Sequence, residues 1–312
     1  MLQILSWRTV NICADHAERL GQTTARGVLS SNKRTPEEGY VDVSQIMGEA
    51  VTIDKDERLS HALETLGKKS VDRLVVIQNG EVRGILTYAD IADRLGVSKV
   101  VALSIKRLHV SSAMTDTVIS VAPDDEVTDV ARLMVERGMS GCPVIDKKGS
   151  LVGVITKTEI ARLLEKFDNV KVGSLMTTGD ILQVNPITRL IKARADMLDA
   201  GYSGLPVTDG GRVLGLLTER MVAEAMARFT VEVPDKHRAN QVRQIRVVDA
   251  MLKQPPLVTP EDSLSEAVTK MLDANLNTLP VVGEGNRLVG MISSTDLARF
   301  VANKYKVPDA TE

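Results

Sequence analysis

The 312-residue sequence predicts an α+β fold in which helices and strands are mixed within four copies of one small unit. One observation is a run of glycine, two apolar residues and Ser or Thr, which recurs at residues 84–87, 153–156, 215–218 and 290–293. A second observation is a methionine a few residues before the first strand of each copy: Met47, Met114, Met176 and Met251. Self-similarity at a regular period is typical of repeat architectures, so the chain is best described as one unit written four times.

The second copy shows the order of elements most clearly. Residues 118–121 predict a short strand, and Pro123 with the acids that follow it favours a helix N-terminus, whose unpaired N–H groups attract negative charge. Apolar residues then recur at helical spacing, and Gly138 after the last turn is typical of a left-handed helix cap. Residues 142–145 and 151–155, separated by a polar turn, predict a hairpin, and Thr156 opens a second helix. The unit is therefore strand, helix, strand, strand, helix.

The other copies follow the same order. Their first strands are expected near residues 51–53, 181–184 and 257–259. We place the copies at residues 43–96, 110–168, 172–229 and 247–303, with an N-terminal extension at 1–42, to which we assign no function, and a tail at 304–312. Residues 230–246 predict a polar linker, whereas only residues 168–171 separate the second copy from the third. We therefore expect two pairs of copies that pack together.

The composition limits the classes of function. A formal net charge of −2 and an aromatic content of 3% argue against binding to nucleic acid or to an anionic membrane. No apolar run approaches the roughly 20 residues of a membrane-spanning helix, and no secretory signal is visible. Two cysteines, Cys13 and Cys142, suit a reducing compartment, so we expect a cytoplasmic protein. The four histidines lack metal-ligand spacing, and we expect no metal site.

Three signatures give the chain a family resemblance. They are the methionine, the glycine run extended to Ser/Thr-x-x-Asp, and a second strand of small and apolar residues with Pro-Val at 140–144, 203–207 and 277–281. On these residues the chain resembles proteins with four CBS domains in two Bateman pairs, such as the gamma subunit of AMP-activated protein kinase and stand-alone prokaryotic and archaeal CBS proteins. The first copy departs from the pattern, with Val75 in place of the proline. The resemblance implies that paired units face each other across a pseudo-two-fold axis, with two clefts per pair, and close into a disc.

The resemblance also implies a class of ligand, because the clefts of many CBS proteins bind AMP, ADP, ATP or S-adenosylmethionine. The acid of one copy would contact the ribose, and the first two strands of the paired copy would hold the adenine. A short carboxylate can accept hydrogen bonds from both ribose hydroxyls, and the helix N-terminus beside it can receive a phosphate. The same spacing is that of a capping box, which needs no ligand, so spacing alone leaves both interpretations open.

The four copies differ at the acid. The first and fourth copies are intact. In the first cleft the predicted ligand residues are Thr87 and Asp90, with an adenine wall of Val118, Ile119, Gly141, Cys142 and Pro143. In the second they are Ser293 and Asp296, with a wall of Ile181, Leu182, Gly204, Leu205 and Pro206. The second copy has Thr156 and the longer Glu159, and the third has Met221, which cannot accept a ribose hydroxyl. The sequence thus predicts two complete clefts, one altered cleft and one empty cleft.

Cations near these clefts are candidates for phosphate contacts. By the pseudo-symmetry of the pair, Arg220 is expected at the phosphate end of the Asp296 cleft, where a guanidinium suits phosphate. The alternative is a solvated surface arginine. Lys157 and Arg73 are weaker candidates for the first pair.

The favoured function is a regulatory sensor, in which an adenosyl ligand changes the packing of the pairs and the state of an unknown partner protein. The adenine nucleotide or S-adenosylmethionine would be a bound ligand and not a catalytic cofactor. An enzyme resembling IMP dehydrogenase is disfavoured, because the four copies leave no room for a barrel or a nucleophile loop. A nucleic-acid-binding or scaffold protein that uses the disc surface is the remaining alternative. The disc can also stack with a second copy as a homodimer.

Overall fold

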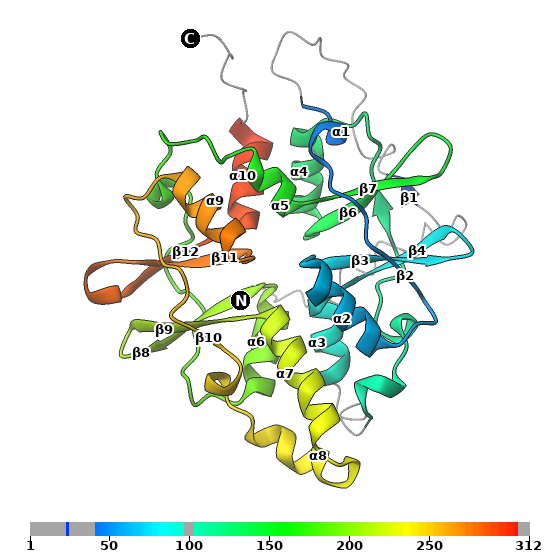
Figure 1. Ribbon diagram of the computed structural model, residues 1–312. Helices are drawn as coiled ribbons and strands as arrows, with labels where there is room; N and C mark the ends of the chain where they lie inside the picture. Colours follow the sequence, from blue (N-terminus) through cyan, green and yellow to red (C-terminus); the bar gives the residue numbers. More distant parts are fainter. Residues whose placement is uncertain (1–22, 25–40, 97–102, 305–312) are drawn as a thin grey trace, which may run out of the picture.

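The computed structural model describes residues 23–24, 41–96 and 103–304. They form four similar units around a common centre, with the sheets of the first two units on one side and those of the last two on the other (Figure 1). This arrangement confirms the expected mixture of helices and strands in each unit. Most of the N-terminal extension, residues 97–102 and the tail from residue 305 lie outside the described residues.

The first two units run in the predicted order. The elements of unit one are α1 (Val43–Ile46), β2 (Thr52–Asp54), α2 (Leu59–Lys69), β3 (Arg73–Gln78), β4 (Glu81–Thr87) and α3 (Tyr88–Gly96). Those of unit two are β5 (Ile119–Ser120), α4 (Val127–Glu136), β6 (Gly141–Ile145), β7 (Leu151–Thr156) and α5 (Lys157–Arg162), preceded by 3₁₀ turns at Ile105–Arg107 and Val110–Ser112. A short strand of the extension, β1 (Thr23–Thr24), pairs in parallel with β5.

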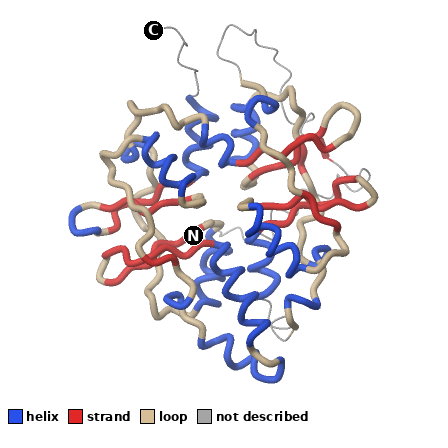
Figure 2. Tube along the Cα trace, viewed as in Figure 1, coloured by secondary structure: helices blue, strands red, loops and turns tan. Residues whose placement is uncertain are grey.

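The last two units keep the later elements of this order, but the first strands expected near residues 181–184 and 257–259 are reduced to single bridges at Val184 and Val258. Figure 2 shows the strands of the four units apart from most of the helices. The elements of unit three are a 3₁₀ turn (Val172–Ser174), α6 (Leu190–Ala200), β8 (Gly204–Asp209), β9 (Arg212–Thr218) and α7 (Glu219–Glu232). Those of unit four are β10 (Leu252–Lys253), α9 (Leu264–Asp273), β11 (Thr278–Val282), β12 (Leu288–Ser293) and α10 (Ser294–Lys304). Between them lie α8 (Asp235–Gln241) and 3₁₀ turns at Val242–Gln244 and Val247–Asp249; a further turn, Glu284–Asn286, joins β11 to β12.

Proline controls how far the first strand of each unit pairs with the second. Unit one forms a parallel ladder of three residue pairs between β2 and β3, and the Val75 N–H donates to the Val51 carbonyl at 2.9 Å. In the described parts of the other units the equivalent contact is a single bridge: Val121 with Val144, Val184 with Val207, and Val258 with Val281. Proline precedes the second residue of each of these bridges and has no N–H to donate. The departure of unit one from the pattern therefore lengthens its sheet.

The recurring glycine of one unit contacts the recurring methionine of the other unit in the same pair. A Cβ added to each glycine would lie within 3.0 Å of the methionine sulfur of the paired unit, in the combinations Gly153–Met47, Gly84–Met114, Gly290–Met176 and Gly215–Met251. Backbone bridges lie beside these contacts, between Ile85 and Thr115 in the first pair and between Thr177 and Met291 in the second. Two of the sequence signatures are thus the two halves of one contact, which joins unit one to unit two and unit three to unit four.

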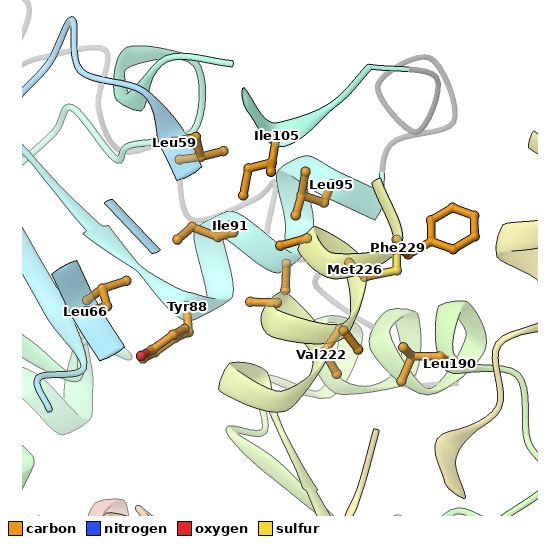
Figure 3. Packing of buried hydrophobic residues seen from close by; sticks show 14 of the residues in the cluster. Leu59, Leu66, Tyr88, Ile91, Leu95, Ile105, Leu190, Val222, Met226 and Phe229 are labelled. Atoms are coloured by element: carbon orange, nitrogen blue, oxygen red, sulfur yellow. The ribbon is translucent and has the colours of Figure 1, made fainter. Parts of the chain in front are cut away.

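Helices join one pair to the other, and the hydrophobic cores follow the helices. One core contains buried residues of units one and three, where α3 packs against α6 and α7 (Figure 3). Ile91 and Leu95 of α3 and Val222 and Met226 of α7 all belong to this core (Figure 3). The other core contains units two and four, where α10 packs against α4 and α5. Each core is therefore shared between the two pairs, and the expectation that the pairs pack together is confirmed.

The connection between units three and four is largely helical, although its polar sequence suggested a loop. Helix α7 continues to Glu232, and α8 follows after Pro234. Arg238 of α8 is 4% exposed and donates to the Val233 carbonyl at 2.7 Å, so a charged residue anchors this segment. In the part of the chain that the structure describes, no helix is both long enough and apolar enough to cross a membrane.

Candidate functional site

The first candidate cleft begins at the N-terminus of α3. The Thr87 N–H and hydroxyl both donate to Asp90 Oδ2, at 2.7 and 2.6 Å, and the Asp90 N–H donates back to the Thr87 hydroxyl at 3.3 Å. This reciprocal arrangement is a capping box. The second oxygen, Oδ1, accepts only a long hydrogen bond, 3.3 Å, from Thr115 of unit two. One oxygen of Asp90 therefore caps the helix and the other faces the paired unit.

The second candidate cleft has the same geometry at α10. The Ser293 N–H and hydroxyl donate to Asp296 Oδ2 at 2.9 and 2.6 Å. Asp296 is 6% exposed, and its Oδ1 accepts from Arg299 at 3.0 Å. Arg299 stands three residues after the acid, a spacing at which helical side chains meet, so the sequence contained this signal and we did not use it.

The other two units match their predicted differences. Thr156 and Glu159 form a capping box, and the Glu159 carboxylate lies against Gly48 of unit one, at the place where Thr115 faces Asp90. In unit three the Thr218 hydroxyl accepts from the Met221 N–H at 3.4 Å, so this helix is capped by the hydroxyl without a carboxylate. Met221 packs instead between the two hydrophobic cores.

The residues of the predicted adenine walls differ in whether their side chains can face a cleft. Cys142 and Leu205 are fully buried members of the cores, so they offer only their backbone to a cleft. The remaining wall residues lie on strands of the paired unit or just before them. Gly141, Pro143, Gly204 and Pro206 are buried on β6 and β8, whereas Ile119 of β5 and the loop residues Val118, Ile181 and Leu182 are partly buried. Because side chains alternate along a strand, the small glycines and the prolines share the face opposite to Cys142 and Leu205.

The three candidate cations have different partners in the structure. Arg220 is expected at Asp296, but its described ion pair is with Glu224 of the same helix at 3.1 Å, and its charge acts on Tyr88 of unit one. Side chains at i and i+4 of a helix are neighbours, which accounts for this pair. Lys157, expected in the first pair, donates instead to Thr295 of unit four at 2.9 Å. Arg73 stays in the first pair, held by Asp72, with its guanidinium against Gly141.

Burial perturbs the titration of several groups near the centre. Burial raises the pKa of Asp90, against hydrogen bonds from Thr87 and Thr115 that lower it. Burial likewise raises the pKa of Glu159. Glu219, which sequence reasoning missed, has a pKa raised to about 7 by burial and by Asp90 and Asp72. Perturbed groups of this kind gather at functional sites more often than elsewhere.

Neither a catalytic thiol nor a metal centre is suggested by this geometry. Burial raises the pKa of Cys142 to about 12, which leaves the thiol protonated and unreactive. Within residues 23–24, 41–96 and 103–304, no cluster of three His, Cys, Asp or Glu side chains could hold a metal ion.

Known proteins resemble this chain along most of its length. The CBS domain family matches residues 43–97, 110–166, 172–228 and 242–303. Protein MJ1225 of Methanocaldococcus jannaschii is 24% identical over 267 residues, 81% of this chain and 95% of that protein. Its crystal structure, described as that of a candidate archaeal homologue of g-AMPK, covers 83% of this chain and 99% of that chain, with a TM-score of 0.74 and 22% identity.

Two further relatives limit how much the likeness implies. A conserved protein of Pyrococcus horikoshii, 22% identical with a TM-score of 0.56, covers 84% of this chain and 100% of its own, and so shares the fold. An inosine-5′-monophosphate dehydrogenase of Korarchaeum cryptofilum is 26% identical over 176 residues, 56% of this chain but only 32% of the enzyme. The likeness to that enzyme is therefore confined to a minor part of it.

Proposed function

This chain belongs to the CBS-domain family, and we propose that it is a regulatory sensor that binds adenosine-containing molecules in the Asp90 and Asp296 clefts. The observation that carries the proposal is the second oxygen of each acid. Oδ2 completes the helix cap, whereas Oδ1 of Asp90 has one long bond to Thr115 and Oδ1 of Asp296 is paired with Arg299. A capping role uses one oxygen, so the other can accept a ribose hydroxyl without uncapping the helix.

The surroundings of these acids also fit a nucleoside. The facing strands of the paired unit present glycine, proline and aliphatic side chains, which suit the flat and apolar faces of adenine. The helix N-termini of α3 and α10 supply unpaired N–H groups for a group at the ribose 5′ position. Glu159 is longer by one methylene and Met221 has no carboxylate, so we assign no nucleoside to those two clefts.

The position of the acids suggests how a ligand would be sensed. Asp90 and Asp296 lie in the first turns of α3 and α10, and these helices also form the interface between the pairs. A ligand that orders either helix N-terminus would bias the packing of α3 on α7 or of α10 on α4 and α5. Such a shift requires that the ligand bind one packing state more tightly than the other. The partner that reads this state would be a protein of the cytosol, where adenine nucleotides are abundant.

We propose a regulatory role and not a catalytic one because the four CBS matches occupy most of residues 43–303. The relative that is an enzyme is matched over 32% of its own length, which leaves its catalytic part outside the likeness. Nothing observed in the described residues favours the nucleic-acid alternative over ligand sensing.

Isothermal titration calorimetry with AMP, ATP and S-adenosylmethionine tests the proposal on protein that mass spectrometry shows to be free of nucleosides. We expect at least one of the three to bind. Asp296→Asn should weaken binding at its cleft by about 1–3 kcal/mol, the cost of losing a charge-assisted hydrogen bond. Asp199→Asn on the exposed face of α6 is the matched control and should change nothing. An absence of heat with all three ligands would rule out the proposed function.

A further inference from the structure

The residue that follows the capping Ser or Thr is different in every unit: Tyr88, Lys157, Glu219 and Ser294 in chain order. In units two and three this residue reaches across the interface between the pairs. Lys157 Nζ donates to Thr295 Oγ1 at 2.9 Å, in the first turn of the helix that carries Asp296. Glu219 lines a small cavity together with Ala89, in the first turn of the helix that carries Asp90. Thr295 and Ala89 occupy the same position in their units, so the first turn of α10 contacts a lysine and the first turn of α3 lies beside a glutamate.

Positive charge surrounds the helix N-terminus at Asp296. Lys157 is 7% exposed, and the one described hydrogen bond of its ammonium is to the neutral hydroxyl of Thr295. Burial, Arg73 and Arg299 together lower the pKa of Lys157 to about 8, against Asp296, which raises it. The N-terminus of α10 adds partial positive charge of its own. A buried ammonium in such surroundings is unfavourable unless an anion accompanies it.

The helix N-terminus at Asp90 has the opposite balance of charge. Glu219 is directed at this end of α3 and interacts electrostatically with the Asp90 and Asp72 carboxylates. The described cations on this side are engaged. Asp72 holds the Arg73 guanidinium at two points, Nε to Oδ1 at 3.0 Å and NH2 to Oδ2 at 2.7 Å. Arg220, whose charge acts on Tyr88 at the start of α3, is paired with Glu224 at 3.1 Å. Arg194, which lines the same cavity as Glu219, is paired with Asp93 at 3.1 Å. A phosphate at this helix end would face carboxylates whose neighbouring cations are engaged.

We propose that charge sorts the two clefts by ligand: the Asp296 cleft binds a 5′-phosphorylated adenosine, and the Asp90 cleft binds an adenosine whose 5′ substituent is neutral or cationic, such as a thioether or sulfonium. This inference rests on the proposed function and specifies it further. Lys157 determines specificity at the first of these clefts, because its ammonium can donate to a phosphate bound at the start of α10. Glu219 determines specificity at the other by repelling an anion.

Separate titrations of ligand-free protein assign each ligand to its cleft. The probes are AMP and 5′-methylthioadenosine, and the variants are Asp90→Asn and Asp296→Asn. We expect Asp296→Asn to lower the affinity for AMP at least tenfold and to leave that for methylthioadenosine within twofold, and Asp90→Asn to do the reverse. If each probe binds both clefts equally, charge sorting is wrong while the proposed function survives. If neither probe binds, charge sorting is wrong, and the proposed function falls with it only when ATP and S-adenosylmethionine also give no heat.

A second experiment tests Lys157 itself. Lys157→Met should lower the affinity for AMP about 10- to 100-fold, the effect of losing a charge-assisted hydrogen bond, and leave the affinity for unphosphorylated adenosine within twofold. Lys157→Arg should keep most of the AMP affinity. The matched control is Lys148→Met in the exposed turn between β6 and β7, which should alter neither affinity. A merely structural role for Lys157 would lower AMP and adenosine affinity equally, and that result would overturn the assignment.

Glu219 offers the reciprocal test. In the Asp296→Asn background, Glu219→Gln should raise the affinity of the remaining cleft for AMP at least threefold, because the anion that repels phosphate has been removed. Methylthioadenosine should bind that cleft as before. An unchanged preference for methylthioadenosine over AMP would show that Glu219 does not set it.

Discussion

Replacing Glu219 by glutamine is expected to stabilise the ligand-free protein near pH 8 and to change its stability little near pH 4. Burial, followed by the charges of Asp90 and Asp72, raises the pKa of Glu219 from its ordinary value of 4.5 to about 7. Between those two values the folded protein holds a proton that the unfolded chain has released. The stability that this group contributes is therefore fully present below the unfolded pKa and is lost as the pH rises through the folded pKa.

The magnitude follows from the size of the pKa shift. A change of one in a pKa corresponds to about 1.4 kcal/mol. The rise of the Glu219 pKa from 4.5 to about 7 therefore corresponds to about 3 kcal/mol. The side chain is only partly buried, and screening by the remaining solvent contact reduces the expected effect to about 2 kcal/mol. Glutamine keeps the shape of the side chain and carries no charge at any pH.

Urea unfolding followed by circular dichroism from pH 4 to pH 8 measures the effect. The difference in the free energy of unfolding between variant and wild type should be near zero at pH 4 and should grow to about 2 kcal/mol by pH 8. Glu232→Gln, at the exposed end of the same helix, is the matched control and should show no such trend. A difference that is independent of pH, or a variant that is less stable at pH 8, would refute this account of Glu219.

Three further predictions concern stability and reactivity. Lys157→Met should raise the free energy of unfolding at pH 7 by about 1–2 kcal/mol, and this gain should fade above pH 8. The reason is that burial lowers the pKa of Lys157 to about 8 and thus disfavours its charged form. A variant that urea unfolding shows to be less stable than the wild type would contradict this. Gly84→Ala should cost about 1–3 kcal/mol, because the new methyl would lie 2.7 Å from the Thr115 carbonyl, whereas Gly67→Ala, with nothing within 4 Å, should be neutral or stabilising in the same thermal-unfolding assay. Cys142 should stay unlabelled by a thiol reagent in the folded protein, as read by peptide mapping, because its thiol is buried with a pKa near 12; labelling at the rate of an exposed thiol would contradict its placement.

Local patterns were sufficient for the helices, hairpins and capping residues of each unit, but they predicted first strands in units three and four where the structure has single bridges. The glycine, the methionine and the Ser/Thr-x-x-acid spacing are short-range features, and the structure explains each by a specific contact, such as Gly84 against Met114. The absence of a carboxylate at Met221 also follows from the sequence alone. These features succeed because each depends on residues within one unit or on the pairing of identical units.

Contacts between the pairs could not be predicted in this way. Lys157 reaches Thr295 although 138 residues separate them, and no periodicity in either segment specifies that meeting. For Arg220, pseudo-symmetry within a pair suggested a phosphate contact but did not show that Glu224 of the same helix is its ion-pair partner. A comparison of the four residues after the capping hydroxyl would have revealed Lys157 and Glu219 as charged exceptions. Their role still depended on knowing which helices pack together.

Native mass spectrometry tests the central claim most directly. Ligand-free protein is incubated with a mixture of AMP, ATP, S-adenosylmethionine and methylthioadenosine, and the mass bound to each chain is measured. We expect adenosine-containing ligands to bind, and we expect the Asp90→Asn, Asp296→Asn double variant to lose them while Asp199→Asn keeps them. A wild-type chain that binds none of the four compounds, or a double variant that binds them undiminished, would contradict the claim.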